Sequence, residues 1–205
     1  IAHTAFQALA KLNAYQATLF SLGSASTRQG ASFALMRMHD PKLIEKLITQ
    51  VKKEKNVEIQ QVIITILARL YHREAQWQGD SWSTRPDTRG PYYQLATWEA
   101  SDSILECLNQ FLESPQTPKQ LNASIVTTLG ENRIQNDLGL IQILKLAEND
   151  NSLLPTVLNQ LADKDNIPVQ ATPLIITAAS DPKTPSNNLA IAVKLLTKID
   201  HPQVY

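Results

Sequence analysis

The sequence predicts an all-α fold in which short amphipathic helices pack as successive hairpins. Apolar residues recur at intervals of three and four through most of the 205 residues, which is the period of a helix with one buried face. No segment keeps the strict alternation typical of a half-buried strand, so essentially no sheet is expected. Capping residues followed by proline recur at the turns, as at helix starts.

The composition indicates a globular chain with a core of its own. At 43% hydrophobic and 19% charged residues, a chain of this length buries a real core. The formal net charge is zero, which argues against nucleic acid as the main partner, because phosphate binding needs an excess of Lys and Arg on one face.

The sequence contains no candidate membrane span and no targeting signal. No apolar run approaches the roughly 18 residues that cross a bilayer, and no signal peptide is present. The sequence begins with Ile rather than Met. We therefore interpret it as a piece of a longer or processed protein, and expect one helical-repeat domain over residues 1–205.

The helices expected from periodicity begin and end at local signals. Ser26 or Thr27 is expected to cap the third helix. Asp40 is expected to cap the fourth, with Pro41 at its first position, where a missing N–H costs nothing. Thr117 followed by Pro118 opens a later helix in the same style. The predicted helical ranges are 2–12, 14–22, 27–38, 41–51, 57–71, 99–112, 118–130, 138–147, 153–161, 169–179 and 188–199.

Short strings within these helices repeat. Residues 34–38 (Ala-Leu-Met-Arg-Met) and 66–70 (Ile-Leu-Ala-Arg-Leu) match in character at a separation of about 32 residues, and residues 8–12 (Ala-Leu-Ala-Lys-Leu) have the same form. One helix pair cannot bury its apolar face alone, so stacked pairs complete each other's core. This pattern resembles HEAT or armadillo-like repeats and implies an α-solenoid of helical hairpins. The competing interpretation is an irregular all-α domain.

One long connection, roughly residues 74–97, interrupts the repeats. Connections beyond about 12 to 15 residues are uncommon and often functional. All three tryptophans of the chain lie in it or directly after it, with charged residues interleaved. The candidate binding residues are Trp77, Asp80, Trp82, Arg85, Asp87, Arg89, Tyr92, Tyr93 and Trp98.

This insertion has two interpretations. As a binding surface, its aromatic faces stack on sugars or clamp a partner, Arg85 and Arg89 hold a carboxylate or phosphate, and Asp80 and Asp87 accept hydroxyls or join a calcium site. As a structural element, its tryptophans fasten it to the helices, and Arg85 pairs with Asp80 or Asp87. A rigid insertion serves both roles.

The insertion also resembles a segment of a known family. The string Gly79-Asp-Ser-Trp-Ser-Thr-Arg-Pro-Asp-Thr-Arg-Gly-Pro-Tyr-Tyr93, followed by Thr-Trp-Glu, is similar to a segment in large exported bacterial proteins. Those proteins join a dehydrogenase-like β-propeller, HEAT-like repeats and a c-type cytochrome. Their usual form is Gly-Asp-Trp-Trp-Gly-Thr-Arg-Pro-Asp-Thr, and Ser81 and Ser83 depart from it. The resemblance implies a periplasmic or cell-envelope setting, with a spacer or docking role between redox modules.

The sequence contains no set of residues that converges on catalysis. Cys107 lies on the apolar side of a predicted helix, so we expect a buried structural thiol. The four histidines, His3, His39, His72 and His201, show no metal-ligand spacing. His72 stands at the entrance to the insertion, where an axial-ligand or proton-donor role competes with that of an ordinary helix-end histidine. No metal or cofactor is expected.

Two functions follow from these observations. The first is a non-catalytic scaffold or protein-interaction module that docks neighbouring domains of the parent protein, or another protein, through the Trp-rich insertion. The alternative is a small-molecule or glycan pocket formed by the insertion, which contributes to an enzyme completed by other domains. We do not expect this segment to be an enzyme alone.

Overall fold

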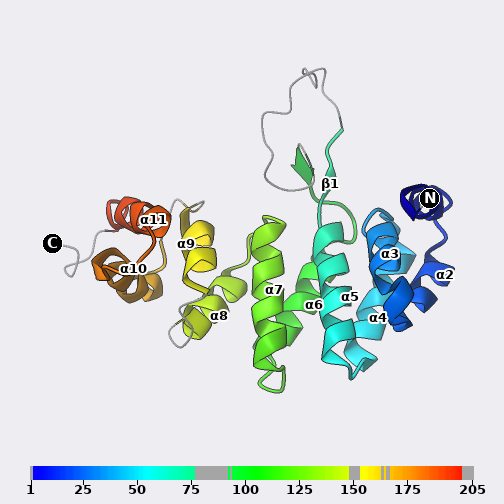
Figure 1. The fold of residues 1–205 in the computed structure, drawn as a ribbon, viewed down its shortest axis with the longest axis horizontal. Coiled ribbons are helices and arrows are strands. Elements are labelled where there is room, and N and C mark those ends of the chain that lie inside the picture. Colours follow the sequence, from blue (N-terminus) through cyan, green and yellow to red (C-terminus); the bar gives the residue numbers. More distant parts are fainter. Residues whose placement is uncertain are drawn as a thin grey trace. The chain divides into compact units, whose positions relative to one another are not determined.

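The computed structural model describes residues 2–76, 92, 94–147, 153–162, 164 and 167–199. It is mostly helical, as the sequence predicts (Figure 1). The chain divides into two compact units, residues 1–134 and 135–205. Each unit is described by itself.

The first unit contains seven α-helices and a short strand pair among its described residues. Their bounds are α1 Ala2–Lys11, α2 Tyr15–Phe20, the 3-10 helix η1 Ser21–Gly23, α3 Ala25–Leu35, α4 Pro41–Lys53, α5 Val57–Leu70, β1 Arg73–Glu74, β2 Leu95–Ala96, α6 Ser101–Glu113 and α7 Lys119–Glu131. These helices follow the predicted ranges to within a few residues.

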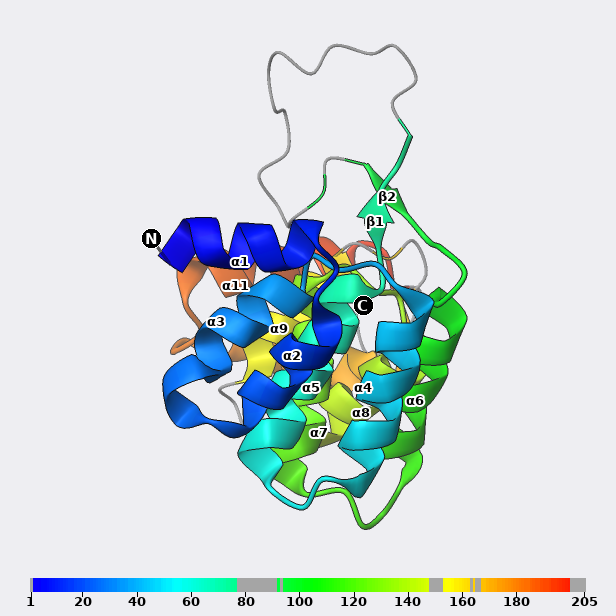
Figure 2. The same cartoon turned by 90° about the vertical axis from the view of Figure 1, so that its right-hand side faces the viewer.

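Two layers of helices make up the body of this unit. Helix α3 packs against α5, and α5 packs against α7. Beside them, α4 packs against α6. The turned view shows α4 and α6 on one side and α3, α5 and α7 on the other (Figure 2). From α3 to α7, consecutive helices therefore alternate between the two layers.

Helix α5 is the centre of this core because it packs against α3, α4, α6 and α7. Ile63, Ile64, Ile66 and Leu67 are all fully buried, so its β-branched run forms a helix enclosed on several sides rather than a strand. The three-and-four spacing of its apolar residues also predicts that Ile59 and Val62 are buried, but both are only half-buried. A one-sided stripe was the wrong expectation for a helix with four neighbours.

The expected cap of α4 is confirmed. The Asp40 side chain accepts a hydrogen bond from the Lys42 backbone N–H at 2.8 Å, and Pro41 is the first helical residue. Asn56 caps α5 in the same way, by accepting from the Glu58 and Ile59 N–H groups at 2.9 and 3.4 Å. Both side chains satisfy donors that a helix start leaves unpaired.

The expected start and end of α3 are wrong. The helix begins at Ala25 with the extended Ser24 in the capping position, and the Ser24 side chain makes no capping hydrogen bond. The Thr27 hydroxyl instead donates to the Ser21 carbonyl at 2.7 Å. At its other end α3 stops at Leu35, not at Met38, because residues 36–38 form the turn into α4.

The expectation of essentially no sheet needs a small correction. Strands β1 and β2 pair antiparallel, with Arg73 opposite Ala96 and Glu74 opposite Leu95. The Ala75 N–H extends the pairing by donating to the Gln94 carbonyl at 2.9 Å. The insertion therefore leaves and rejoins the helices as a short two-stranded ribbon.

The second unit is also helical in its described residues. It contains α8 Asp137–Ala147, α9 Leu154–Ala162, the 3-10 helix η3 Val169–Ala171, α10 Thr172–Ser180 and α11 Ser186–Leu196. Helix α9 packs against α8 and α11, and α10 packs against α11. Their facing residues, such as Leu158, Leu161 and Ile175, are fully buried. No helix among the described residues of the chain is long and apolar enough to cross a membrane.

Candidate functional site

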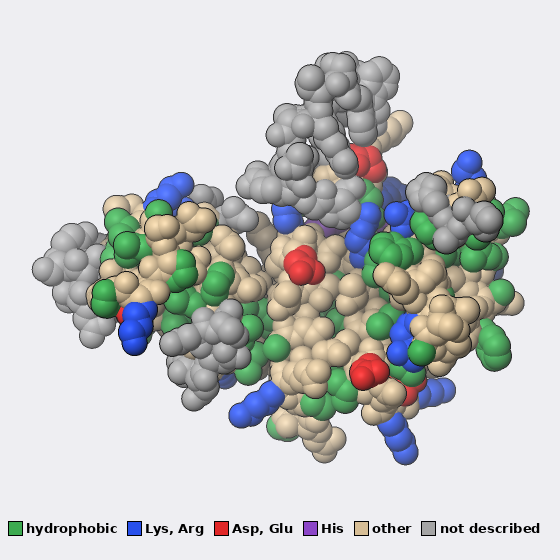
Figure 3. Space-filling model, in the orientation of Figure 1, with side chains coloured by type: hydrophobic (Ala, Val, Ile, Leu, Met, Phe, Trp, Pro, Cys, Tyr) green, Lys and Arg blue, Asp and Glu red, His purple; other side chains and the backbone are tan. Residues whose placement is uncertain are grey.

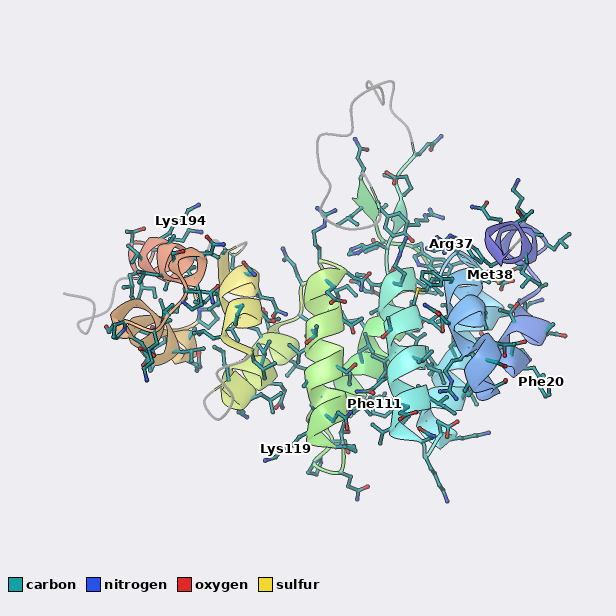
Figure 4. The ribbon with its side chains drawn as sticks, viewed as in Figure 1. Phe20, Arg37, Met38, Phe111, Lys119 and Lys194 are labelled. Carbon is teal, nitrogen blue, oxygen red and sulfur yellow. The ribbon has the colours of Figure 1, made fainter. Side chains whose placement is uncertain are left out.

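The two ends of the insertion meet at the ends of α3, α5 and α7. We call this place the insertion base and define it by His39, Arg69, His72, Tyr92 and Trp98. Figure 4 shows Arg37 and Met38 beside it, at the end of α3. Of the predicted binding residues, Tyr92 and Trp98 belong to it. The others lie outside the described residues: Trp77, Asp80, Trp82, Arg85, Asp87, Arg89 and Tyr93.

His39 joins the turn before α4 to the start of the insertion. Its Nε2 lies 2.9 Å from the His72 carbonyl oxygen, which only accepts, so Nε2 carries the proton. The Tyr92 hydroxyl lies 3.2 Å from the same nitrogen and donates to the Arg69 carbonyl at 3.5 Å. The imidazole of His39 is thus an oriented donor between two segments of the chain.

The environment of His39 favours its neutral form. Burial is the largest cause that lowers its pKa, and the positive charges of Arg69 and Arg73 lower it further, while the hydrogen bond to His72 opposes them. A charged imidazole loses hydration here and meets like charges. His39 is therefore neutral at pH 7.

His72 extends the connection from α5 to α7. Its side chain is buried, its Nδ1 donates to the Asn132 carbonyl at 3.2 Å, and the Tyr71 ring packs edge-on against it at 4.6 Å between centroids. Burial lowers the pKa of His72, and Arg133 lowers it further against the effect of the Asn132 hydrogen bond. This geometry is that of a helix-end histidine which ties two helices together.

Trp98 and Ser101 cap the end of α5. The indole N–H of Trp98 donates to the Leu70 carbonyl at 2.7 Å, and the Ser101 hydroxyl donates to the Tyr71 carbonyl at 2.7 Å. Ser101 also accepts from the Trp98 backbone N–H at 2.9 Å. The last carbonyls of a helix lack partners within the helix, so the returning end of the insertion supplies them.

Tyr92 lies between two arginines. The Arg69 guanidinium carbon is 4.2 Å from the centroid of the tyrosine ring, and Arg133 Nη2 donates to the Tyr92 carbonyl at 3.4 Å. Burial raises the pKa of Tyr92, so its hydroxyl stays protonated at neutral pH. Among the described residues, the buried Arg69 Nη1 has no hydrogen-bond partner.

Only part of the insertion base was visible in the sequence. Tyr92, Trp98 and His72 were singled out, whereas His39 and Arg69 were not. A signal for both exists, because the matching repeat strings continue as Arg37-Met-His39 and Arg69-Leu-Tyr-His72. In each of two repeats an arginine is thus followed by a histidine, two positions later in the first and three positions later in the second.

The one cysteine of the chain lies outside the insertion base. Cys107 in α6 is buried, as predicted, and burial raises the pKa of its thiol to about 11. The thiolate needed for nucleophilic attack is therefore scarce at neutral pH. Within the described ranges, no group of three or more His, Cys, Asp or Glu side chains is arranged to hold a metal ion.

Comparison of the chain with protein-family models, curated proteins and solved structures finds no match.

Proposed function

We propose that this chain is a non-catalytic helical-repeat scaffold that docks a neighbouring domain of its parent protein through the Trp-rich insertion. The observation that carries the proposal is the fastening of both ends of the insertion. His39 and His72 hold the outgoing end, while Trp98 and Ser101 hold the returning end, all through hydrogen bonds to backbone carbonyls.

Fixed ends favour binding by the segment between them. Holding the ends of a loop removes part of the conformational entropy that an interface otherwise costs on association. Residues 77–91 contain Trp77, Trp82, Arg85 and Arg89, and Trp, Tyr and Arg dominate binding energies at protein interfaces. The insertion thus combines supported ends with the residue types of an interface.

The packing of the first unit supports the α-solenoid interpretation. Contacts of α3 with α5 and of α5 with α7, together with those of α4 with α6, are the contacts expected between stacked hairpins of the HEAT or armadillo kind. In this proposal the repeats form a spacer within a larger exported redox protein, in a periplasmic or cell-envelope setting.

The chemistry of the buried groups agrees with a binding role. Both histidines of the insertion base are neutral donors to backbone carbonyls, and the one thiol is protonated. Catalysis needs a group poised to exchange a proton or attack a substrate. The two histidines instead hold segments of the chain in place through these hydrogen bonds.

Association with the other domains encoded in the same reading frame tests this function. Titration calorimetry of the chain with those domains is expected to show that Trp82→Ala and Arg85→Ala each weaken binding about tenfold or more, as at interface hot spots. Phe20→Ala is the matched control, because this aromatic side chain on α2 is 89% exposed and lies outside the insertion. Wild-type affinity in both insertion variants, with unchanged thermal stability, would contradict the proposal.

A further inference from the structure

A groove lies between α2 and α4 of the first unit, in the part of the chain that precedes the insertion. Its volume of about 1160 Å³ exceeds the roughly 300–1,000 Å³ that is usual for small-molecule pockets. Leu19, Phe20 and Gly23 line it from the side of α2 and η1. Lys46 and Lys53 line it from α4. We call it the α2–α4 groove, and its size suits a segment of protein rather than a small ligand.

The side of the groove formed by α2 and η1 is apolar and open to solvent. Phe20 is 89% exposed, and Leu19 beside it is half-buried. Figure 4 shows the Phe20 side chain directed away from the helices of the first unit. A Cβ added at Gly23 would meet no heavy atom within 4 Å, so this side leaves open space as well. A large aromatic side chain beside an open groove is the kind of residue that anchors protein interfaces.

The side formed by α4 and the residues after it is mainly cationic. Lys46, Lys53 and Lys55 line it and are all exposed. Two acids, Glu45 and Glu54, accompany them. The Glu54 carboxylate accepts hydrogen bonds from two backbone N–H groups, both at 2.9 Å. The groove thus combines an apolar wall with an excess of positive charge, which favours an acidic partner.

Charge is distributed unevenly along the first unit. Residues 1–56 contain eight Lys or Arg and three Asp or Glu, a net charge of +5 on a chain whose formal net charge is zero. Figure 3 shows Lys and Arg side chains where α4 ends and α5 begins. Residues 99–118, which include α6, contain four Asp or Glu and no Lys or Arg. One unit therefore carries both a basic groove and an acidic helix.

The exposed face of α6 carries its acids around one apolar residue. Asp102, Glu106 and Glu113 are exposed, and they border one hollow of the surface together with the half-buried Leu105. The Gln110 amide donates to Glu106 at 3.3 Å, and this neutral donor leaves the charge of the carboxylate in place. Among the described residues, no ion pair involves these acids or the lysines of the groove. Both sets of charges are therefore available to a partner.

The lysines of the groove and the acids of α6 share one spacing. Lys46 and Lys53 are seven residues apart in α4. Glu106 and Glu113 are also seven residues apart, in α6. Seven residues are about two turns, so each pair lies near one helix face with about 10.5 Å between its members along the axis. Lys53 suits the helix dipole at the end of α4, whereas Glu113, the last residue of α6, opposes it. The place of Glu113 is therefore not explained by its own helix.

We propose that the α2–α4 groove binds α6 of a second copy of this chain. Glu106 and Glu113 of one copy pair with the two lysines of α4 in the other, and Leu105 packs against Phe20. Because the two surfaces differ, each contact leaves one groove and one α6 free, and copies add head to tail unless a ring closes. No residue of the insertion takes part, so this contact is independent of the proposed docking role.

Sedimentation velocity at rising protein concentration tests the contact. The wild-type chain is expected to form larger species at an ionic strength of about 20 mM and to stay mostly monomeric at about 500 mM, because salt screens exposed ion pairs. Lys46→Glu and Glu106→Lys each place like charges in the contact and are each expected to weaken association about tenfold. Gly23→Gln adds bulk inside the groove without changing its charge and is expected to weaken association at least about threefold.

A mixture of Lys46→Glu and Glu106→Lys gives the sharpest result. The Glu106→Lys chain keeps a wild-type groove, and the Lys46→Glu chain keeps a wild-type α6. The mixture is therefore expected to associate about as strongly as the wild type, although each variant alone is weakened. This recovery also shows that both variants are folded. A mixture that associates no more than its separate components would overturn the proposal.

Two exposed residues supply matched controls. Lys42→Glu makes the same charge change on α4 but outside the described lining of the groove. Glu131→Lys makes the same charge change as the α6 variant, at the last residue of α7. Each control is expected to change association less than about twofold. Losses as large as those of Lys46→Glu and Glu106→Lys would overturn the proposal, as would a wild-type chain that stays monomeric at low salt.

Vesicles containing phosphatidylglycerol separate this contact from binding to an anionic lipid surface, to which exposed aromatic and lysine side chains also bind. In self-association, Lys46→Glu and Glu106→Lys act alike. Cosedimentation with vesicles that is lost in Lys46→Glu and kept in Glu106→Lys, with a monomeric wild type, would overturn the contact between copies in favour of lipid binding.

Discussion

The helical body of the first unit and the insertion base are held together by different forces. In the body, side chains such as Leu47, Ile63 and Leu67 are fully buried against neighbouring helices, and burial of apolar surface is insensitive to pH. At the base, donors from His39, His72 and Trp98 meet backbone carbonyls. The body is therefore expected to set global stability, and the base to set how firmly the insertion is fastened.

Truncation of the central core is expected to give the largest effect. Leu67→Ala on α5 removes a fully buried side chain and should lower the free energy of unfolding by about 2–5 kcal/mol, through lost burial and the cavity left behind. Urea unfolding followed by circular dichroism measures this change. Phe20→Ala, which truncates a side chain that is 89% exposed, should change stability by less than about 0.5 kcal/mol.

Loss of the Trp98 hydrogen bond should have a smaller and more local effect. Trp98→Phe keeps a ring beside His39 but leaves the Leu70 carbonyl without its donor at 2.7 Å, at a cost of about 1–3 kcal/mol. Hydrogen exchange should become faster in residues 71–76 while exchange in α5 changes little. If α5 and residues 71–76 lose protection equally, the body and the base are not separable.

The helix caps Asp40 and Asn56 test the difference between the helical body and the insertion base. Both side chains accept hydrogen bonds at the start of a helix, but they lie in different places. Asp40→Ala and Asn56→Ala each remove a side chain that accepts from the first N–H groups of a helix, so each should destabilise the chain by about 1 kcal/mol. Only Asp40 lies next to His39. Faster exchange at residues 71–76 is therefore expected in Asp40→Ala and not in Asn56→Ala.

Acidification should give the smallest change in global stability. Its effect should fall selectively on the insertion base. The pKa values of His39 and His72 are lowered in the folded chain, so the unfolded chain binds more protons below its ordinary histidine pKa of about 6.5. The stability that the two neutral histidines contribute is complete above that pH. It declines as the pH falls from about 6.5 towards the pKa values of the folded chain.

Hydrogen exchange at pH 7 and pH 5 measures this effect, after correction for the intrinsic pH dependence. Protection of residues 71–76 should fall severalfold more than protection of α5. The decline should be smaller in the double variant His39→Gln, His72→Gln, which lacks both titrating rings. An unchanged pH response in that variant would assign the effect to other groups.

The sequence carried enough information for the helices and little for the insertion base. Helix ranges and the Asp40 cap depend on neighbours within a few positions, and the three-and-four spacing of apolar residues shows them. The buried set of α5 was predicted less well, because Ile64 is enclosed only through packing against several other helices. Such enclosure is a property of tertiary structure.

The contacts of the insertion base could not be predicted either, because they too are a property of tertiary structure. His39 and His72 are 33 positions apart, and His72 and Asn132 are 60 apart, so no local pattern joins them. Trp98 was singled out by its residue type, and its bond to Leu70 agrees with the fastening role considered for the tryptophans. The arginine in each matching string and the histidine that follows it were the clue to His39 and Arg69.

The capping of α5 by Trp98 and Ser101 also defines how the insertion can be exchanged for another sequence. A tight turn spliced directly from Tyr71 to Ser101 would remove the indole that satisfies the Leu70 carbonyl, so a full deletion would leave the last residue of α5 without this donor. A graft that keeps residues 71–76 and 92–101 retains these bonds. The chain thus offers an acceptor site for foreign loops whose borders are set by hydrogen bonds rather than by the ends of the helices.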